Sequence, residues 1–220
     1  TVYLADEQTA GRGRGAHDWH SAAGSGLYVS ILLRPQIAPA DILWLSLAAG
    51  LAVQAAVRDV TSLEPDIRWP NDLLLSRRKL GGILTELNAE VTRVRHAVIG
   101  IGLNVHQPLF PPELAALATS LRIETGKDWP RQELLIALLF RLHEEIERLT
   151  SPDHQASAAA EISARLTAVS SWIRGKHVIV SEADTFSGVT DGLDSRGFLR
   201  VRTSQGIRTV LSGGVREGAR

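Results

Sequence analysis

Apolar and polar positions follow two patterns along the chain, and the two patterns predict different structures. Short apolar runs predict strands at residues 2–5, 27–33, 66–69, 72–75, 82–88 and 96–105. Apolar residues at helical spacing predict helices at residues 41–60, 113–119, 131–149 and 156–168. Ser151, Pro152 and Asp153 are expected to separate the last two helices. We therefore predict one domain of strands and helices over residues 1–170.

After Trp172 the pattern changes to short runs in which apolar and polar residues alternate. The runs lie at residues 177–180, 186–189, 198–202 and 208–211. Glycine-containing turns at residues 191–192, 195–197 and 205–206 are expected to separate them. Strands at this spacing are typical of a small β-barrel of about 50 residues. We place this second domain at residues 171–220.

Composition argues against several classes of function. The chain has 220 residues, of which 44% are hydrophobic, with no cysteine and a formal net charge of zero. The balanced charge argues against the basic face of a nucleic-acid binder. Ser46, Gly50 and Gln54 interrupt the most apolar stretch, residues 42–57, so no membrane span is expected. Because the chain shows neither a signal-peptide pattern nor cysteine, the cytoplasm is its expected location.

A long polar loop, residues 6–26, separates the first two predicted strands. Loops of this length inside a compact domain are commonly functional. Residues Gly11 to Gly15 read Gly-Arg-Gly-Arg-Gly, which combines accessible backbone N–H groups with fixed positive charge. Such a segment suits an anion, although a flexible surface loop has the same composition. It also matches a dinucleotide-binding fingerprint, but no helical pattern follows it, and a Walker phosphate loop would need Gly-Lys-Ser/Thr.

Three further motifs place polar side chains at the ends of predicted strands. Residues 68–72 read Arg-Trp-Pro-Asn-Asp, residues 79–83 read Lys-Leu-Gly-Gly-Ile, and residues 100–104 read Gly-Ile-Gly-Leu-Asn. Lysine is rare among the 24 basic residues, so Lys79 suggests a need for a compact charge. Taken singly, the motifs are equally consistent with an Asx turn, a solvated hairpin tip and a capped strand end. The histidines lack metal-binding spacing, so no zinc site is expected.

Taken in order, these motifs resemble the biotin protein ligase family far more specifically than any one of them does alone. The matching segments are Gln8 to Arg14, Trp19, Arg68 to Asp72, Lys79 to Ile83 and Gly100 to Asn104. The resemblance extends from Val2 to about Gly214. It implies an α+β fold, with a mixed β-sheet backed by helices as in class II aminoacyl-tRNA synthetases, and a small C-terminal SH3-like β-barrel.

The resemblance also implies a role for each matching residue. Biotin contacts are implied at Gln8, Arg12, Gly13, Arg14, Lys79 and Gly82. Nucleotide contacts are implied at Gly11, Arg14, Trp19, Asn71 and Asn104. Catalytic roles are implied for Lys79, Arg14 and Asp72, and we expect Asp72 to orient the acceptor amine or to take its proton.

The implied reaction uses ATP and Mg²⁺ to convert biotin into biotinyl-5′-AMP and then transfers biotin to a lysine of a biotin carboxyl carrier protein. Arg12, Arg14 and Lys79 would offset the repulsion between the biotin carboxylate and the phosphates. A lipoate protein ligase would use the same chemistry on another acid, and a non-enzymatic binding module would leave the loop inert. The resemblance leaves homodimer formation open.

The chain departs from the family pattern at three places. Arg68 stands where the family usually has lysine, and Gly15-Ala16 replaces the commoner continuation of the glycine-rich loop. The family's Ser-Thr-Asn segment should precede Thr1, and the chain, which has no methionine, begins within a predicted strand. We therefore expect part of the biotin pocket, and the protein's own N-terminus, to lie upstream of Thr1.

Overall fold

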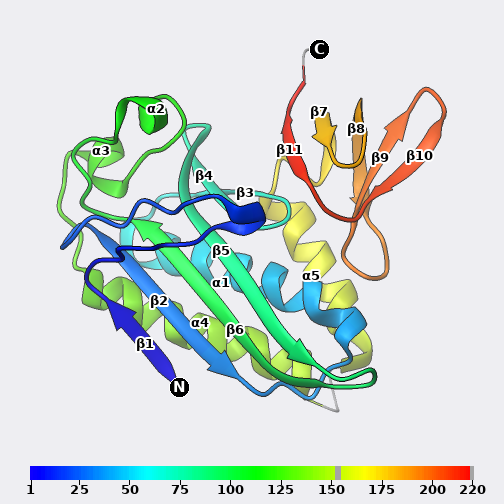
Figure 1. The fold of residues 1–220 in the computed structure, drawn as a ribbon, viewed down its shortest axis with the longest axis horizontal. Coiled ribbons are helices and arrows are strands. Elements are labelled where there is room, and N and C mark those ends of the chain that lie inside the picture. The colour runs from blue at the N-terminus through cyan, green and yellow to red at the C-terminus, as the bar shows by residue number, and fades with distance from the viewer. Residues whose placement is uncertain (152–154, 219–220) are drawn as a thin grey trace.

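The computed structural model describes residues 1–151 and 155–218 and contains a six-stranded sheet with helices on one face (Figure 1). In spatial order the strands are β1 (Val2–Ala5), β2 (Gly26–Leu33), β6 (Val94–Asn104), β5 (Arg78–Ala89), β4 (Asp72–Leu75) and β3 (Asp66–Arg68). Each neighbouring pair of these strands is antiparallel. The α+β class, with the sheet backed by helices, is confirmed, but the named strands pair only in antiparallel fashion where a mixed sheet was expected.

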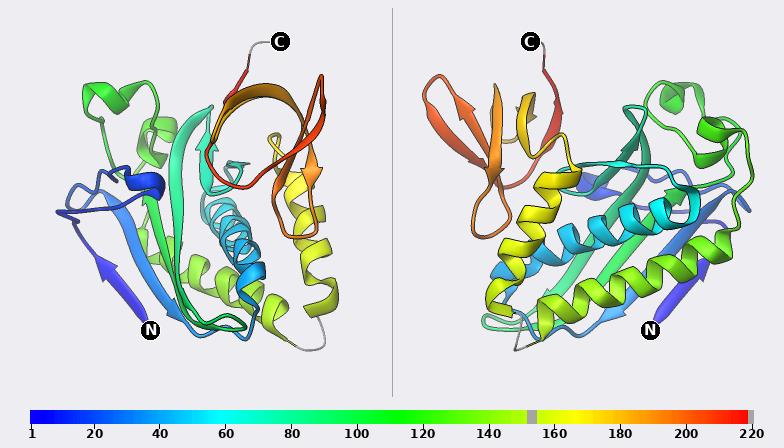
Figure 2. Two further views of the ribbon diagram at one scale, coloured as in Figure 1. Left: turned by 45° about the vertical axis from the view of Figure 1, so that its right-hand side comes forward. Right: turned by 180° about the vertical axis from the view of Figure 1, so that it is seen from behind.

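Three long helices cover the same face of this sheet, as the view from behind in Figure 2 shows. They are α1 (Ile42–Thr61), α4 (Arg131–Thr150) and α5 (Gln155–Val169). Helix α1 is apolar nearly all round, so it packs between the sheet and the other helices, with Leu45 and Leu47 fully buried. Each such leucine stabilises the fold by about 1.5–3 kcal/mol. The opposite face of the sheet carries the loop between β1 and β2.

The segment that contains α1 differs from its sequence prediction in one respect. Over Pro39–Thr61 it is long and apolar enough, by length and composition, to cross a membrane, despite the polar residues that interrupt it. In the folded protein 72% of this apolar window is buried. The apolar character of α1 is therefore explained by its burial in the core between the first sheet and the other helices.

A five-stranded sheet forms the C-terminal part of the molecule. Its spatial order is β10 (Gly206–Val210), β9 (Leu199–Thr203), β8 (Thr185–Leu193), β7 (Arg174–Ser181) and β11 (Gly214–Glu217). It contacts the first part of the chain at Trp69, whose Nε1 donates to the carbonyl oxygen of Gly197 at 2.9 Å. The segment that leads from α5 into β7 is tied to β3 by Ser170, whose Oγ donates to the Ile67 carbonyl at 2.5 Å. The tryptophan of the Arg-Trp-Pro-Asn-Asp motif is thus part of the junction between the two sheets.

Several predicted elements differ from the structure, because tertiary contacts outweigh the local pattern. The predicted helix at 113–119 is too long: α2 (Pro112–Ala115) has four residues, and the backbone of Lys79 then pairs with Leu117 and Thr119. Strand β8 runs through the predicted turn at 191–192 by means of a register shift, with Gly192 at φ 87°. Strand β11 was not predicted, and α3 (Leu121–Thr125) follows α2 as a separate short helix. The predicted helix break at Pro152 and Asp153 lies outside the described residues.

Candidate active site

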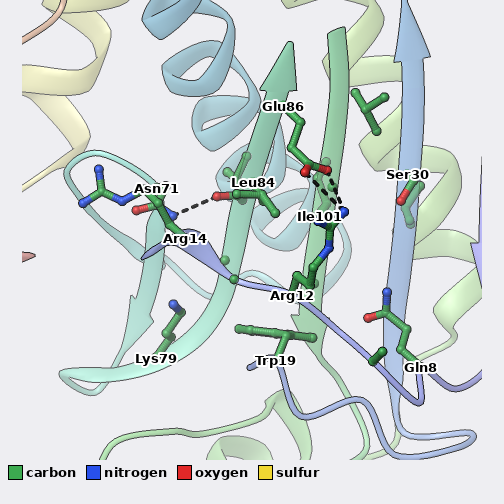
Figure 3. Close-up of a pocket in the computed structure, with 18 residues that line it drawn as sticks. Gln8, Arg12, Arg14, Trp19, Ser30, Asn71, Lys79, Leu84, Glu86 and Ile101 are labelled. Carbon is green, nitrogen blue, oxygen red and sulfur yellow. Dashed lines mark hydrogen bonds and ion pairs between the residues drawn. The ribbon is translucent and has the colours of Figure 1, made fainter. Parts of the chain in front are cut away.

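A cavity of about 260 Å³ lies on the face of the first sheet that the helices leave open (Figure 3). Strands β2, β5 and β6 form its floor, and the loop between β1 and β2 forms its roof. The residues that line it are Gln8, Ala10, Arg12, Gly13, Arg14, Trp19, Val29, Ser30, Asn71, Lys79, Gly82, Ile83, Leu84, Glu86, Val98, Gly100, Ile101 and Gly102. Their mixture of apolar, amide and cationic groups suits a small molecule that carries an anion.

Glycines in the floor let an indole ring lie flat on the sheet. Gly82 and Gly102 are direct partners across β5 and β6. A Cβ atom at Gly102 would collide with the ring of Trp19, and one at Gly82 would lie 3.3 Å from Trp19 Cζ3. Trp19 Nε1 is buried and has no hydrogen-bond partner among the described residues. The ring therefore offers an apolar face to the cavity, while its Nε1 lies against the backbone at Gly102.

The roof is a narrow ribbon rather than an open loop. Across it, Gln8 N donates to Ser21 O at 3.2 Å, Trp19 N to Gly11 O at 2.9 Å and Gly13 N to His17 O at 2.7 Å. These pairs give the roof its ribbon shape, and Arg12 and Arg14 of its glycine-rich segment line the cavity.

A buried hydroxyl orients the glutamine of the roof. Ser21 Oγ donates to Gln8 Oε1 at 2.6 Å. Gly11 is required beneath this contact, because a Cβ there would lie 2.9 Å from Ser21 Oγ and 3.2 Å from Gln8 Oε1. Gly11 thus shapes the roof from behind and does not line the cavity.

Arg131 at the start of α4 fastens the two ends of the roof. Its Nη1 donates to Asp6 Oδ1 and to the carbonyl oxygen of Gly26, both at 3.0 Å. Gly24 N in turn donates to Asp6 Oδ2 at 3.2 Å. The base of the roof is therefore anchored to helix α4.

One buried carboxylate holds the lysine of the site. Lys79 Nζ lies 2.6 Å from Asp72 Oδ1, and Arg68 Nη2 lies 2.6 Å from Asp72 Oδ2. Burial opposes the ionisation of Asp72, but the charges of Lys79 and Arg68 and their hydrogen bonds outweigh it and hold the pKa of this carboxyl below its usual value. Asp72 thus lies behind Lys79 and fixes the direction of the ammonium.

The two arginines of the roof have different partners. Arg12 pairs with Glu86 of β5 at 3.2 Å, and both side chains are largely exposed. Arg14 is half-buried and donates a hydrogen bond to the carbonyl oxygen of Gly213 in the C-terminal sheet. Burial lowers the pKa of Arg14, with a smaller opposing effect from the charge of Asp72. Together with Lys79, the two guanidinium groups give the cavity three cations.

The structure brings most of the residues predicted from the sequence to this cavity. Those that line it are Gln8, Arg12, Gly13, Arg14, Trp19, Asn71, Lys79 and Gly82. Asn71 is also held in place, since its Nδ2 donates to the Ile83 carbonyl at 2.8 Å. Gly11, Asp72 and Asn104 support the cavity without lining it.

Asn104 lies beneath the site as a buried brace. Its side chain is 3% exposed, and its Nδ2 donates to the carbonyl oxygens of Thr119 at 3.0 Å and Lys79 at 3.4 Å. Its Oδ1 accepts from Gln107 Nε2 at 3.1 Å. The Asn104 side chain therefore links the backbone of Lys79 to that of Thr119.

Sequence reasoning missed three contributors to the site. Glu86 reads as one of several polar residues on a strand, and Ser21 as an ordinary loop serine. Gly213 lies 199 residues from its partner Arg14. No local sequence pattern could have predicted the contact of Gly213 with Arg14. The alternation of residues along β5 puts Glu86 on the same face as Gly82, so it could have predicted that Glu86 lies at the site.

The described residues contain no group of three or more His, Cys, Asp or Glu side chains that could hold a metal ion. The acidic groups nearest the cavity are Glu86, which pairs with Arg12, and Asp72, which is buried between two cations. A divalent cation here would therefore have to arrive with most of its oxygen ligands on the substrate, as Mg²⁺ does on a nucleoside triphosphate.

Comparisons with known proteins agree with this geometry. Residues 1–104 match the model of the biotin/lipoate A/B protein ligase family, and residues 174–215 match that of the biotin protein ligase C-terminal domain. The bifunctional ligase/repressor BirA of Bacillus subtilis is 34% identical over 99% of this chain, which spans 66% of the length of that relative. The biotin–[acetyl-CoA-carboxylase] ligase of Mycobacterium tuberculosis is 34% identical over 96% of this chain and 75% of its own length.

A solved structure extends the likeness to the fold. A biotin protein ligase from Aquifex aeolicus in complex with biotin and ATP matches with a TM-score of 0.84 and 32% identity, covering 99% of this chain and 89% of that one. Both sheets of the present chain fall within the matched region.

Proposed function

The chain belongs to the biotin protein ligase family, and we propose that it activates biotin with ATP and then transfers the biotinyl group to a lysine of a carrier protein. The relatives that support the proposal are named ligases of biotin to acetyl-CoA carboxylase, and one of their solved structures holds biotin and ATP. The observation that carries the proposal is the convergence of Arg12, Arg14 and Lys79 over one cavity that also presents Gln8 and an indole face.

The first half-reaction joins two anions. A carboxylate oxygen of biotin attacks the α-phosphorus of ATP, the bond to the β-phosphate oxygen breaks, and pyrophosphate leaves with biotinyl-5′-AMP as the other product. The three cations offset the repulsion between the groups before the bond forms, and they stabilise the charge that develops on the phosphoryl oxygens. In this proposal Gln8 and Arg12 hold biotin, and Asn71 and Trp19 hold the nucleotide; all four line the cavity. Mg²⁺ would reach the site bound to the triphosphate and add charge neutralisation there.

Asp72 acts through Lys79 in this scheme. A carboxyl whose pKa is held low and which is buried between two cations is a poor proton acceptor at neutral pH. Its geometry suits a positioning role instead, since its oxygens fix both Lys79 Nζ and Arg68 Nη2 at 2.6 Å. The two roles expected from the sequence concerned the acceptor amine of the carrier lysine, which Asp72 would orient or deprotonate. We propose instead that Asp72 orients the ammonium of Lys79.

The second half-reaction transfers biotin to protein. The unprotonated amine of a carrier lysine attacks the acyl carbon of biotinyl-5′-AMP, an amide bond forms, AMP leaves, and the amine's proton is released to solvent. Because this mixed anhydride is open to hydrolysis, the roof between Arg12 and Gly26 would serve as the cover that excludes water. The acceptor in this proposal is a biotin carboxyl carrier protein or domain, met in the cytoplasm, and a homodimer is one arrangement in which the ligase could act.

The proposal also includes the division of labour between the two parts of the chain. Residues 1–170 would bind biotin and ATP, and residues 171–220 would form a small accessory domain. The names of several relatives include a repressor function. That function belongs to those relatives, of whose length this chain spans 66%, and it is not part of the proposal.

Pyrophosphate release tests the proposal and separates it from its alternatives. The chain is incubated with MgATP and either biotin, lipoate or no acid. Release that depends on biotin supports the proposal, whereas release that depends on lipoate identifies a lipoate ligase. If the chain is folded but releases no pyrophosphate with either acid, it behaves as a non-enzymatic binding module would.

A further inference from the structure

Arg14 links the roof of the site to the C-terminal sheet. It lines the cavity, and its guanidinium donates a hydrogen bond to the carbonyl oxygen of Gly213. Gly213 lies in the connection between β10 and β11, next to the first residue of β11. The small sheet therefore reaches the edge of the proposed nucleotide site through one backbone group.

The three cations of the cavity differ in the group that accepts their hydrogen bonds, and this group determines how much positive charge each has left for a ligand. Lys79 is paired with Asp72 at 2.6 Å and Arg12 with Glu86 at 3.2 Å, so a carboxylate already competes for each. No carboxylate of the described residues forms an ion pair with Arg14. A carbonyl oxygen orients a guanidinium without neutralising it, and the remaining N–H groups stay available to a phosphate.

The turn that presents this carbonyl is itself tightly built. Glu182 Oε1 accepts hydrogen bonds from Leu211 N at 3.0 Å, Ser212 N at 2.7 Å and Ser212 Oγ at 3.2 Å. Gly213 adopts φ 86°, and a Cβ there would collide with the carbonyl of Ser181. Glycine and one carboxylate thus fix the position of the carbonyl that holds Arg14.

We propose that the turn at residues 211–213 is part of the nucleotide site, with Gly213 and Glu182 as positioning residues for Arg14. Arg14 meets a phosphate of ATP, Gly213 sets the direction of its guanidinium, and Glu182 holds the turn. This inference rests on the proposed function. It gives the C-terminal sheet a defined task in the first half-reaction.

Replacement of Glu182 should change the KM for MgATP more than the KM for biotin. Without its carboxylate, three donors of the turn lose their acceptor and the Gly213 carbonyl is no longer fixed. Arg14 must then be ordered by the nucleotide itself. We expect Glu182→Ala to raise the KM for MgATP about tenfold, equivalent to about 1.4 kcal/mol, while the KM for biotin changes less than about twofold.

Two variants serve as controls for this effect. Asp184→Ala removes a carboxylate from the same connection between β7 and β8, where Asp184 pairs with Arg208 at 2.7 Å away from the cavity. It should leave both KM values unchanged. Glu182→Gln keeps one side-chain oxygen as an acceptor for the turn, so it should retain most of the affinity for MgATP.

A double-mutant cycle with Arg14→Ala decides whether Glu182 acts through Arg14. In the Arg14→Ala background, Glu182→Ala should change the KM for MgATP by less than about twofold, because the group that it positions is gone. A tenfold effect in both backgrounds, or no effect in the wild-type background, overturns the inference. A wild-type chain that shows no biotin-dependent pyrophosphate release overturns the proposed function instead, so the two failures are distinguishable.

Discussion

Replacing Lys79 by alanine removes the cation that the structure holds most firmly. Its Nζ lies 2.6 Å from Asp72, and its side chain is 33% exposed, so the charge faces a cavity that is partly shielded from water. A unit charge about 4 Å from a phosphate oxygen contributes about 4 kcal/mol at an effective dielectric constant of about 20. Asp72 offsets part of this. The loss of one preorganised donor from a transition state typically slows a reaction by about 10²–10³-fold, and we expect Lys79→Ala to fall in that range.

Arginine should rescue poorly at this position. A Cβ atom at Gly82 would lie only 3.3 Å from Lys79 Nζ, which shows how closely the ammonium packs against β5. A larger planar guanidinium has little room there, and it would hydrogen bond to Asp72 in a different geometry. Lys79→Arg should therefore keep the charge of the site but recover only a small part of the adenylation rate.

The assay is the initial rate of biotin-dependent pyrophosphate release at saturating MgATP and biotin. Lys176→Ala is the matched control, because Lys176 also pairs with a carboxylate, Glu217 at 2.9 Å, and is similarly shielded, but it does not line the cavity. The control should retain its full rate. Near wild-type activity in Lys79→Ala would refute the reasoning and make Lys79 an ordinary residue of the β4–β5 hairpin.

Three further predictions follow from the same site. Biotin with MgATP should protect the segment from Arg12 to Gly26 against proteolysis, because its charged tip gains an anion to order it; equal cleavage with and without ligands would contradict a covering role. Arg14→Gly should release biotinyl-5′-AMP about 10–150-fold faster, the equivalent of one charge-assisted contact of about 1.5–3 kcal/mol. Streptavidin blotting of an unrelated lysine-rich protein would then show increased labelling, and a variant that makes the adenylate but labels no more than wild type would disprove this containment. Asp72→Asn should lower the free energy of unfolding at neutral pH. Because the pKa of Asp72 is lower in the folded protein than the ordinary aspartate pKa of about 3.9, its carboxylate adds stability above a pH of about 3.9, and this stability is lost as the pH falls through the folded pKa. The difference between variant and wild type in urea unfolding should therefore shrink on acidification, and a difference that grew would count against the account.

Much of the fold could be predicted because its elements are locally encoded. The helical spacing over α4 and the continuous apolar run of β6 specify their own periods, and both elements lie within a residue or two of the predicted bounds. The segment after Pro112 could not be predicted in this way. Its leucines and alanines favour a helix up to residue 119, but helix α2 ends at Ala115. Lys79 N then donates to the carbonyl oxygen of residue 117, and the N–H of residue 119 donates to the carbonyl oxygen of Lys79.

The candidate site was predictable as far as its residues occur in short motifs. Gln8, Arg12 and Lys79 come from two segments whose order along the chain carries the family resemblance. The division between residues that line the cavity and those that support it was not predictable, because it depends on the tertiary partners of each side chain. Asn71 and Asn104 are both asparagines at strand ends, yet only Asn71 lines the cavity. The contact between Arg14 and Gly213 depends on how the two sheets pack, which no short segment encodes. The roles of these residues in catalysis stay predictions.

The central claim is that this chain makes biotinyl-5′-AMP and passes biotin to protein. The most direct measurement is mass spectrometry of a reaction that contains the chain, biotin, MgATP and a biotin carboxyl carrier domain. We expect an adenylate of biotin, pyrophosphate in equal amount, and then one biotinyl group in amide linkage to a single lysine of the carrier. A folded chain that forms no biotinyl-5′-AMP, or that forms an adenylate equally well from lipoate, would contradict the account.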